Sequence, residues 1–311
     1  MSAVIEVSDL SKDYGDLRAV DRLSFSVASG SITGFLGPNG SGKTTTLRAL
    51  LGLVEPSSGT ARIAGSRYRD LEDPLRHVGA MLESSTHPSR TARNHLRVVA
   101  TEARVPRSRV DEVLELVELT SAANRRVGTF SLGMHQRLGL ATALISEPEI
   151  LVLDEPANGL DPQGIRWLRD FLRGLSDDGH TILLSSHVLA EVAQTVDHVV
   201  VIDHGRIVAD EPLDVLMARG AGERVHVRSS DQEALRSYLV AEGAHVTDEA
   251  GALVVTGVGT DTIGRLAFDR HIVIYEIGAV RASLEDTFLD LTADAAGQAT
   301  RHDTDPQEAT S

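Results

Sequence analysis

The amino-acid sequence predicts an α/β protein in which helices wrap a mostly parallel sheet, followed by a smaller α+β unit. Over the first ~215 residues, short apolar runs alternate with amphipathic helical patterns, which is typical of a parallel sheet. From residue 223 the order becomes strand, helix, strand, strand, helix, strand, which is the ferredoxin-like arrangement. A chain of 311 residues, 41% apolar and 24% charged, is long enough for two such globular domains.

Four short apolar runs predict the core strands of the parallel sheet. They cover residues 32–36, 150–153, 181–185 and 199–202, and each ends at a polar residue or a glycine-containing turn. Between the second and third runs, apolar residues at helical spacing predict a helix with one buried face, formed by Ile165, Leu168, Leu172 and Leu175. This pattern is a strand, helix, strand unit.

The patterns divide the chain into two domains and a tail. We expect the first domain over residues 1–219, with a helical insertion at about residues 84–145 that breaks at Pro106 and restarts at a capping box formed by Ser108 and Asp111. The second domain covers residues 220–292, and its last helix begins with a capping box of Ser283 and Asp286. Residues 293–311 are small and polar without apolar periodicity, so we expect them to be disordered.

Composition excludes several classes of function. The net charge of −15 opposes binding to nucleic acid, because affinity for the phosphate backbone scales with the number of phosphates neutralised. The absence of cysteine excludes disulfides and thiolate metal sites. No apolar stretch approaches the length of a membrane-spanning helix, and the first residues do not resemble a secretion signal, so we expect a cytoplasmic location.

A glycine-rich turn fits the P-loop pattern and lies between the first core strand and a helical pattern that contains Leu47 and Leu50. Its glycines let backbone N–H groups surround phosphate oxygens at a helix N-terminus, Lys43 supplies a positive charge, and the Thr44 hydroxyl can bind Mg²⁺. The alternative is an ordinary glycine turn. The predicted nucleotide-binding residues are Gly37, Pro38, Asn39, Gly40, Ser41, Gly42, Lys43, Thr44 and Thr45.

Two consecutive carboxylates end the second apolar run. Asp154 is placed at the tip of a strand, where it can hold the Mg²⁺ water shell, and Glu155 follows it as a candidate base for the water that attacks the γ-phosphate. Alternatively, the two acids simply end a strand in solvent. The chain has only two lysines, Lys12 and Lys43, and neither lies in an Asn-Lys-x-Asp stretch that would recognise guanine, so we expect ATP as the nucleotide.

The order of these motifs resembles that of the ATP-binding subunits of ABC transporters, from Ile5 to Leu216. Residues 130–137 resemble the ABC signature, with Ser131 and Gly133 retained and Leu132 in place of the first glycine. The resemblance implies a P-loop NTPase of the ABC ATPase type that forms a head-to-tail homodimer, in which Ser131 and Gly133 cap the γ-phosphate of ATP held by the partner subunit. The alternative for Ser131, taken alone, is a simple helix cap.

Four further positions correspond to family motifs, one of them with a departure. Residues 159–161 resemble the D-loop, His187 resembles the switch histidine that contacts the γ-phosphate, and Tyr14 lies where the family stacks an aromatic ring on adenine. Glu83 stands where the family's Q-loop has a glutamine that touches Mg²⁺ and follows the membrane partner. For His187 and Tyr14 the alternative is an ordinary structural residue, and for Glu83 it is a solvated loop residue.

Residues 283–291 resemble the ending of ATPase chains in bacterial exporters whose permease is a separate polypeptide. The resemblance therefore implies a Mg²⁺-dependent ATPase that powers export through an integral-membrane permease and lies on the inner face of the membrane. The alternative is a non-transport ABC ATPase acting on ribosomes or DNA, but these usually carry two ATPase halves or long coiled coils, and this chain has one P-loop and no sustained heptads. A small-molecule kinase would leave the signature-like segment unexplained.

Overall fold

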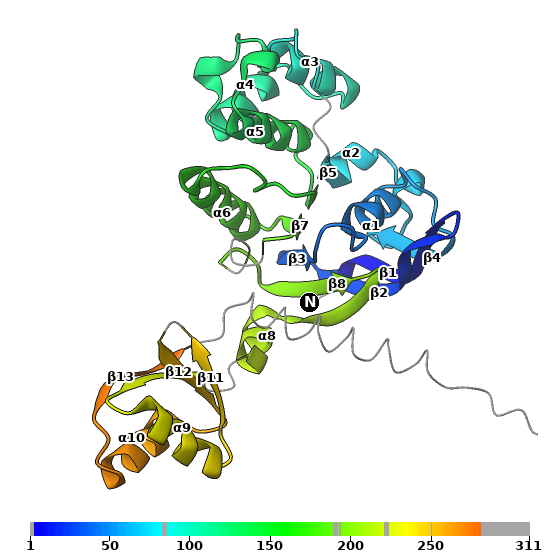
Figure 1. The fold of residues 1–311 in the computed structure, drawn as a ribbon. Coiled ribbons are helices and arrows are strands. Elements are labelled where there is room, and N and C mark those ends of the chain that lie inside the picture. Colours follow the sequence, from blue (N-terminus) through cyan, green and yellow to red (C-terminus); the bar gives the residue numbers. More distant parts are fainter. Residues whose placement is uncertain are drawn as a thin grey trace, which may run out of the picture. The chain divides into compact units, whose positions relative to one another are not determined.

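A six-stranded sheet forms the centre of the N-terminal unit in the computed structural model (Figure 1). The structure describes residues 3–82, 86–188, 192, 194–220, 224–249 and 251–280. Neighbouring strands are parallel except β8 and β9, which are antiparallel. The predicted core strands are present, two of them one or two residues longer than expected. The order is β5 (Val78–Met81), β6 (Ile150–Leu153), β7 (Thr181–Ser186), β3 (Ile32–Leu36), β8 (His198–Asp203) and β9 (Arg206–Pro212).

A second, three-stranded antiparallel sheet belongs to the same unit and was not predicted from the sequence. Its order is β2 (Leu17–Ala28), β1 (Ala3–Tyr14) and β4 (Ser58–Ile63). Alternate residues of β1 and β2 are buried, as expected for a sheet with one face on the core. The pairing of β1 with β2 contains several register shifts, which interrupt the regular alternation along the chain.

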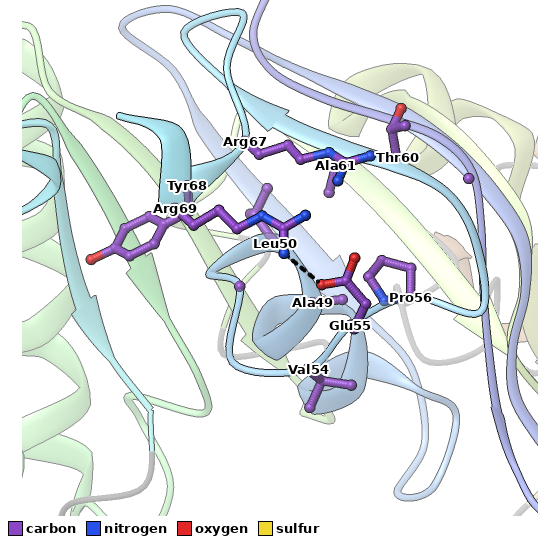
Figure 2. A pocket seen from close by; sticks show the side chains of 12 residues that line it. Ala49, Leu50, Val54, Glu55, Pro56, Thr60, Ala61, Arg67, Tyr68 and Arg69 are labelled. Carbon is purple, nitrogen blue, oxygen red and sulfur yellow. Dashed lines mark hydrogen bonds and ion pairs between the residues drawn. The ribbon is translucent and has the colours of Figure 1, made fainter. Parts of the chain in front are cut away.

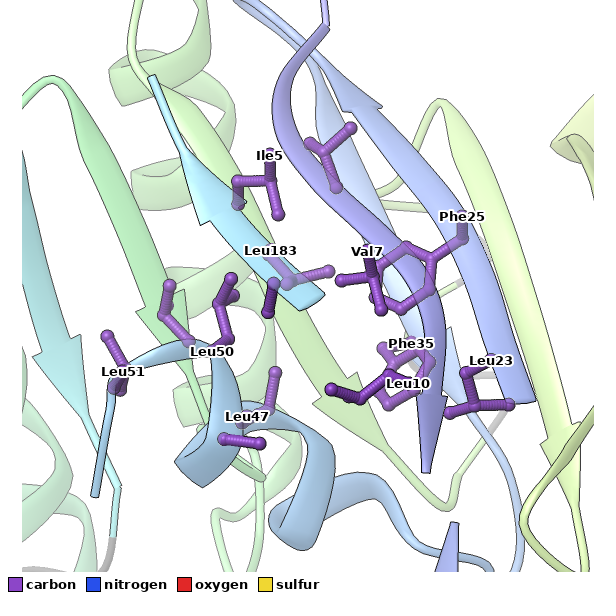
Figure 3. Packing of buried hydrophobic residues seen from close by; sticks show 14 of the residues in the cluster. Ile5, Val7, Leu10, Leu23, Phe25, Phe35, Leu47, Leu50, Leu51 and Leu183 are labelled. Atoms are coloured by element: carbon purple, nitrogen blue, oxygen red, sulfur yellow. The ribbon is translucent and has the colours of Figure 1, made fainter. Parts of the chain in front are cut away.

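One hydrophobic core of the N-terminal unit lies where helix α1 (Lys43–Leu50) and strand β3 meet the antiparallel sheet (Figure 3). Leu47 and Leu50 of α1 are buried in one cluster with Phe35 of β3 and Phe25 of β2. The two phenylalanine rings stack with centroids 5.2 Å apart. The packing fixes both the strand before the glycine-rich turn and the helix after it.

Helices α3, α4 and α5 pack together as the helical insertion (Figure 1). Pro106 separates α3 from α4 as expected, but the predicted capping box at Ser108 is wrong. Arg107 is the N-cap of α4 and makes no side-chain cap, while the Asp111 carboxylate pairs with Arg93 of α3. The helices of this region and the short turns around it are α2 (Pro74–His77), α3 (Ala92–Glu102), α4 (Ser108–Leu116), α5 (Leu132–Ala143), η1 (Tyr68–Asp70), η2 (Thr120–Ala122) and η3 (Val127–Thr129).

One arginine joins the helical insertion to the helix α6 (Pro162–Asp177). The guanidinium of Arg137, on α5, lies 3.7 Å from the ring centroid of Trp167 on α6. Arg137 also donates to the backbone oxygen of Val117 at 3.0 Å and to the carboxylate of Glu118 at 2.6 Å, both at the end of α4. Because this side chain is only 21% exposed, a cation–π contact and two hydrogen bonds converge in a largely dry place.

The second unit begins after Leu213, six residues before the boundary expected at residue 219. Its four strands form an antiparallel sheet in the order β11, β12, β10, β13, with the two helices packed on one face. The succession and the strand order are those of the ferredoxin-like arrangement. The expected last helix at residues 283–291 lies outside the described residues. The elements are α8 (Leu213–Gly220), β10 (Arg224–Ser229), α9 (Gln232–Ala241), β11 (His245–Glu249), β12 (Ala252–Thr256), α10 (Thr260–Asp269) and β13 (Ile274–Val280).

The helices that the structure describes are too short or too polar to cross a bilayer. Among the described residues, none of them combines the length and the apolar character of a membrane span.

We predict that the helical insertion is less stable in acid because of His95. Burial lowers the pKa of this imidazole, and the charge of Arg90 lowers it further. The folded state therefore holds the proton less readily than the unfolded state, so stability is present above the ordinary histidine pKa of 6.5 and is lost as the pH falls below it. Thermal unfolding should shift to lower temperature between about pH 7.5 and about pH 5.5.

The variant His95→Gln should show a flatter pH dependence, since an amide can still bond to the Thr142 hydroxyl that lies 3.2 Å from the imidazole. The control is His87→Gln, at an exposed histidine in the loop before α3. Equal pH slopes for wild type and His95→Gln would contradict the prediction.

We predict that Arg137→Gln destabilises the contact between α5 and α6 by about 1–2 kcal/mol, because it removes the cation from the Trp167 ring and a charged hydrogen bond. Trp167 is the only tryptophan of the chain, so urea unfolding followed by tryptophan fluorescence reports on this contact. Arg166→Gln, at an exposed position on the same helix, is the control. Identical unfolding midpoints for both variants would show that the stacked pair adds no stability.

Candidate nucleotide-binding site

The glycine-rich turn connects β3 to α1 and is pressed against backbone on two sides. A Cβ atom at Gly37 would lie 2.3 Å from the carbonyl oxygen of Ile202, and one at Gly42 would lie 2.5 Å from that of Ala19. Gly42 also has a φ of +106°, which L side chains rarely adopt. Glycine is therefore required at both positions for the turn to take this path.

Helix α1 begins without a capping group of its own. Gly42 is its N-cap, makes no side-chain cap, and is followed by no acidic residue in the first turn. The first N–H groups of a helix have no partner within the helix and carry the positive end of its dipole. This end of α1 can therefore receive an anion, and it brings together the predicted residues from Gly37 to Thr45.

The Lys43 ammonium lies at the mouth of the turn and is only 6% exposed. It donates to the carbonyl oxygens of Gly37 at 2.7 Å and Pro38 at 3.1 Å, and it lies 3.4 Å from a carboxylate oxygen of Glu155. All three acceptors are oxygen atoms that a phosphate oxygen can replace. The geometry thus gives Lys43 a satisfied resting position within the site.

Thr44 and Asp154 face each other at the start of α1 and the end of β6. The Thr44 hydroxyl donates to Oδ2 of Asp154 at 2.8 Å, and the Ser185 hydroxyl donates to Oδ1. Ser185 in turn accepts from the backbone N–H of Glu155 at 2.9 Å. A hydroxyl and a carboxylate are the oxygen ligands that Mg²⁺ prefers, so this donor set fits that ion.

Glu155 links the lysine to the histidine predicted from the sequence. Its Oε2 lies 2.8 Å from Nδ1 of His187, while its Oε1 faces Lys43. Its backbone is in the left-handed region, with a φ of +49°, a conformation that costs energy for a non-glycine residue and that clusters at functional sites. The carboxylate is 22% exposed, so water can reach it.

The signature-like residues lie apart from this cluster. Ser131 is the N-cap of α5, and its hydroxyl accepts from the N–H of Met134 at 3.3 Å. Ser131 and Gly133 line a pocket of about 550 Å³ together with the turn at residues 159–161, and none of the residues of the glycine-rich turn lines that pocket. A Cβ at Gly133 would meet only Leu160, at an ordinary 3.4 Å, so a single chain does not require glycine here.

Of the two remaining predicted residues, the structure describes Tyr14 but not Glu83. Tyr14 ends β1 and is 48% exposed, and the Lys12 ammonium lies 5.0 Å from the ring centroid. An exposed aromatic ring can stack on a flat ligand. Glu83 lies outside the described residues, which stop at Leu82 and resume at residue 86.

The sequence analysis missed Ser185, which holds the Asp154 carboxylate and the Glu155 backbone at once. The only signal was its place at the end of a predicted strand. It also missed Gln136, whose side-chain amide donates to the Asn158 carbonyl oxygen at 3.3 Å and ties α5 to the segment that follows Glu155.

A smaller pocket of about 60 Å³ lies at the other end of α1 (Figure 2). Arg69 and Glu55 pair across it at 3.1 Å, and burial raises the pKa of the Tyr68 phenol in its wall. Ala49 and Leu50 contribute the last turn of α1, whose carbonyl groups disfavour an anion. None of the predicted site residues lines this pocket, so it is separate from the phosphate site.

Comparison with known proteins places these observations in a family. The ABC transporter family model matches residues 20–158, and a family described as a domain of unknown function matches residues 223–285. A solved structure described as an ATP-binding subunit of an ABC transporter is 29% identical, with a TM-score of 0.63, and covers 70% of this chain and 92% of that chain.

Relatives that match over nearly the whole chain are also named as ATP-binding proteins. The bacitracin transport ATP-binding protein BcrA of Bacillus licheniformis is 38% identical over 300 residues, which is 94% of this chain and 98% of that protein. The Nod factor export ATP-binding protein I of Burkholderia orbicola is 36% identical over 300 residues (93% and 97%), and the daunorubicin resistance ATP-binding protein DrrA3 of Streptomyces coeruleorubidus is 34% identical over 314 residues (93% and 96%). The resemblance drawn from the motifs is confirmed: the chain belongs to the family of ABC transporter ATP-binding proteins.

Proposed function

We propose that this chain binds and hydrolyses Mg²⁺-ATP and thereby powers export through a separate integral-membrane permease. The observation that carries the proposal is the cluster of Lys43, Thr44, Asp154, Glu155 and His187 at the uncapped start of α1. Relatives named for bacitracin transport, Nod factor export and daunorubicin resistance support the export direction over an action on ribosomes or DNA. The chain would then lie on the cytoplasmic face of the membrane, held by its permease.

The proposed mode of ATP binding follows from the contacts that Lys43 makes in the structure. The N–H groups from Gly40 to Thr45 receive the phosphates, and Lys43 exchanges its two loop carbonyls and Glu155 for phosphate oxygens. Tyr14 stacks on the adenine ring. Thr44 and Asp154 would hold Mg²⁺, with Glu83 as a further proposed ligand, and the ion would supply charge neutralisation at the phosphates.

Once Lys43 turns to the phosphates, Glu155 keeps its hydrogen bond to His187 and one free carboxylate oxygen. That oxygen can orient an attacking water and accept its proton as the water oxygen bonds to the γ-phosphorus and the bond from that phosphorus to the β–γ bridging oxygen breaks, which releases ADP and inorganic phosphate. Ser185 holds the Glu155 backbone in place during this step.

We predict that Glu155→Gln keeps ATP binding and loses hydrolysis. The variant preserves Lys43, Thr44 and Asp154 but cannot accept a proton, and loss of a general base costs about 10²–10⁴-fold in rate. Binding of a fluorescent ATP analogue and phosphate release should be measured together, and size exclusion with Mg²⁺-ATP should show more dimer than wild type. Lys43→Ala, which should not bind the analogue, is the control. Hydrolysis by Glu155→Gln at the wild-type rate would contradict the assigned role.

We propose further that the site is completed by a second copy of the chain arranged head to tail. Ser131 and Gly133 line a pocket separate from the glycine-rich turn, which fits a role toward the γ-phosphate held by the partner subunit. A side chain at Gly133 would obstruct that approach although the single chain has space for it.

We predict that Gly133→Asp binds ATP but does not hydrolyse it, because the damage acts in the partner's site. Mixing Gly133→Asp with Lys43→Ala produces heterodimers in which one composite site is intact, so some hydrolysis should return. The matched variant is Gly174→Asp, at an open position on α6 where a Cβ meets nothing within 4 Å. Weak ATP binding by Gly133→Asp alone would reject the assignment to the partner's site.

Coupling to a permease is tested by co-expressing the chain with the membrane protein encoded beside its gene. ATP hydrolysis in vesicles containing both chains should exceed that of the isolated chain and disappear with Glu155→Gln. Equal hydrolysis with and without every such partner would contradict the export proposal.

A further inference from the structure

The turn between β8 and β9 touches both the glycine-rich turn and strand β2. The backbone N–H of Gly205 donates to the carbonyl oxygen of Ser41 at 3.0 Å, and the carbonyl oxygen of Gly205 accepts from the N–H of Asp21 at 2.8 Å. One peptide segment of this turn thus bridges the phosphate loop and the strand that follows Tyr14.

The first of these bonds determines where the next N–H group points. The Ser41–Gly42 peptide is trans and planar, so its C=O and N–H groups point in opposite directions. Because the Ser41 carbonyl is held toward Gly205, the Gly42 N–H is turned away from the β8–β9 turn. This N–H belongs to the N-cap residue of α1, where a phosphate is expected.

The β8–β9 turn lies so close to strand β2 that it requires a glycine at the point of contact. Gly205 has a φ of +77°, and a Cβ there would lie 2.9 Å from the carbonyl oxygen of Ala19 and 3.2 Å from the Cα of Val20. The same Ala19 oxygen limits the space at Gly42. The phosphate loop and the β8–β9 turn are therefore packed against one carbonyl group of β2.

An ion pair between the exposed Arg206 side chain and a buried carboxylate fixes the turn at its next residue. Arg206 directs Nε and Nη2 to Oδ2 of Asp21 at 2.8 and 2.7 Å, and the Asp21 side chain is only 7% exposed. Arg18 and Arg22 approach the other carboxylate oxygen at 3.3 and 3.4 Å. Burial alone would raise the pKa of Asp21, but the hydrogen bonds from Arg206 and the three positive charges hold this pKa below its ordinary value.

We propose that Arg206, held by Asp21, is a positioning residue for ATP binding, acting through Gly205 and the Ser41 carbonyl to aim the Gly42 N–H at the phosphates. This inference rests on the proposed nucleotide site and assigns a role to residues that lie outside the P-loop pattern. Loss of the ion pair frees the turn to move, so the phosphate cradle becomes less well aligned while the catalytic carboxylate Glu155 is untouched.

The test uses Arg206→Gln in the full chain, since Asp21 then keeps Arg18 and Arg22 as partners. Affinity for a fluorescent ATP analogue should fall about tenfold, a modest loss for a misplaced positioning group. The rate of hydrolysis at saturating ATP should stay within about twofold, as expected when binding rather than the chemical step is affected. Arg22→Gln removes a neighbouring charge without touching the turn and should bind like wild type.

Two further variants separate positioning from stability. Arg206→Lys keeps the charge but not the paired donors and should recover part of the affinity. Gly205→Ala should weaken binding through the close contact with Ala19. A lower unfolding temperature with unchanged ATP affinity in Arg206→Gln would show a merely structural ion pair and overturn the inference. Unchanged affinity in Lys43→Ala would instead overturn the proposed nucleotide site itself.

Discussion

Burial of α1 and β3 against the antiparallel sheet is the constraint on which the rest of the site depends. Phe35 and Leu47 are fully buried in one cluster, so the end of β3 and the start of α1 are fixed relative to each other. Truncating a buried phenylalanine typically costs about 3–5 kcal/mol, a large share of the stability of a domain. The short turn between the two elements has little freedom left, and glycines at its two ends let it pass against Ile202 and Ala19.

The charged side chains above this core are paired with one another or with backbone oxygens, whereas the buried hydroxyl of Ser41 in the same loop has no hydrogen-bond partner among the described residues. Lys43 has three oxygen acceptors, Glu155 bridges it to His187, and Asp154 accepts from Thr44 and Ser185. Buried charges are tolerated only when they are paired in this way. Under the proposed function, an incoming phosphate would compete with Glu155 for the lysine, and occupation of the loop would release the carboxylate that is proposed to act as the base.

The sequence predicted those parts of the fold and of the site that depend on local patterns. Continuous apolar runs such as residues 150–153 predicted the buried parallel strands, and the P-loop spacing predicted the glycine-rich turn between β3 and α1. The nucleotide-binding role of the residues from Gly37 to Thr45 stays a prediction. The antiparallel sheet escaped prediction because register shifts interrupt the alternation in β1. The capping box at Ser108 failed because Asp111 pairs with Arg93, a partner from another helix. Asp21 and Arg206 are 185 positions apart, so only the tertiary structure brings them together.

The two helix N-termini that are proposed to contact ATP differ in whether a side chain caps them. The start of α1 has no side-chain cap, so its N–H groups are available to a phosphate of the nucleotide proposed to bind to the same subunit. The start of α5 is already capped, since the Ser131 hydroxyl oxygen accepts from Met134. This hydroxyl still has its own proton to donate, because a serine can accept and donate at once. In the proposed head-to-tail dimer, a phosphate at α1 would therefore receive the Ser131 hydroxyl proton of the second copy while the N-terminus of that copy's α5 stays capped.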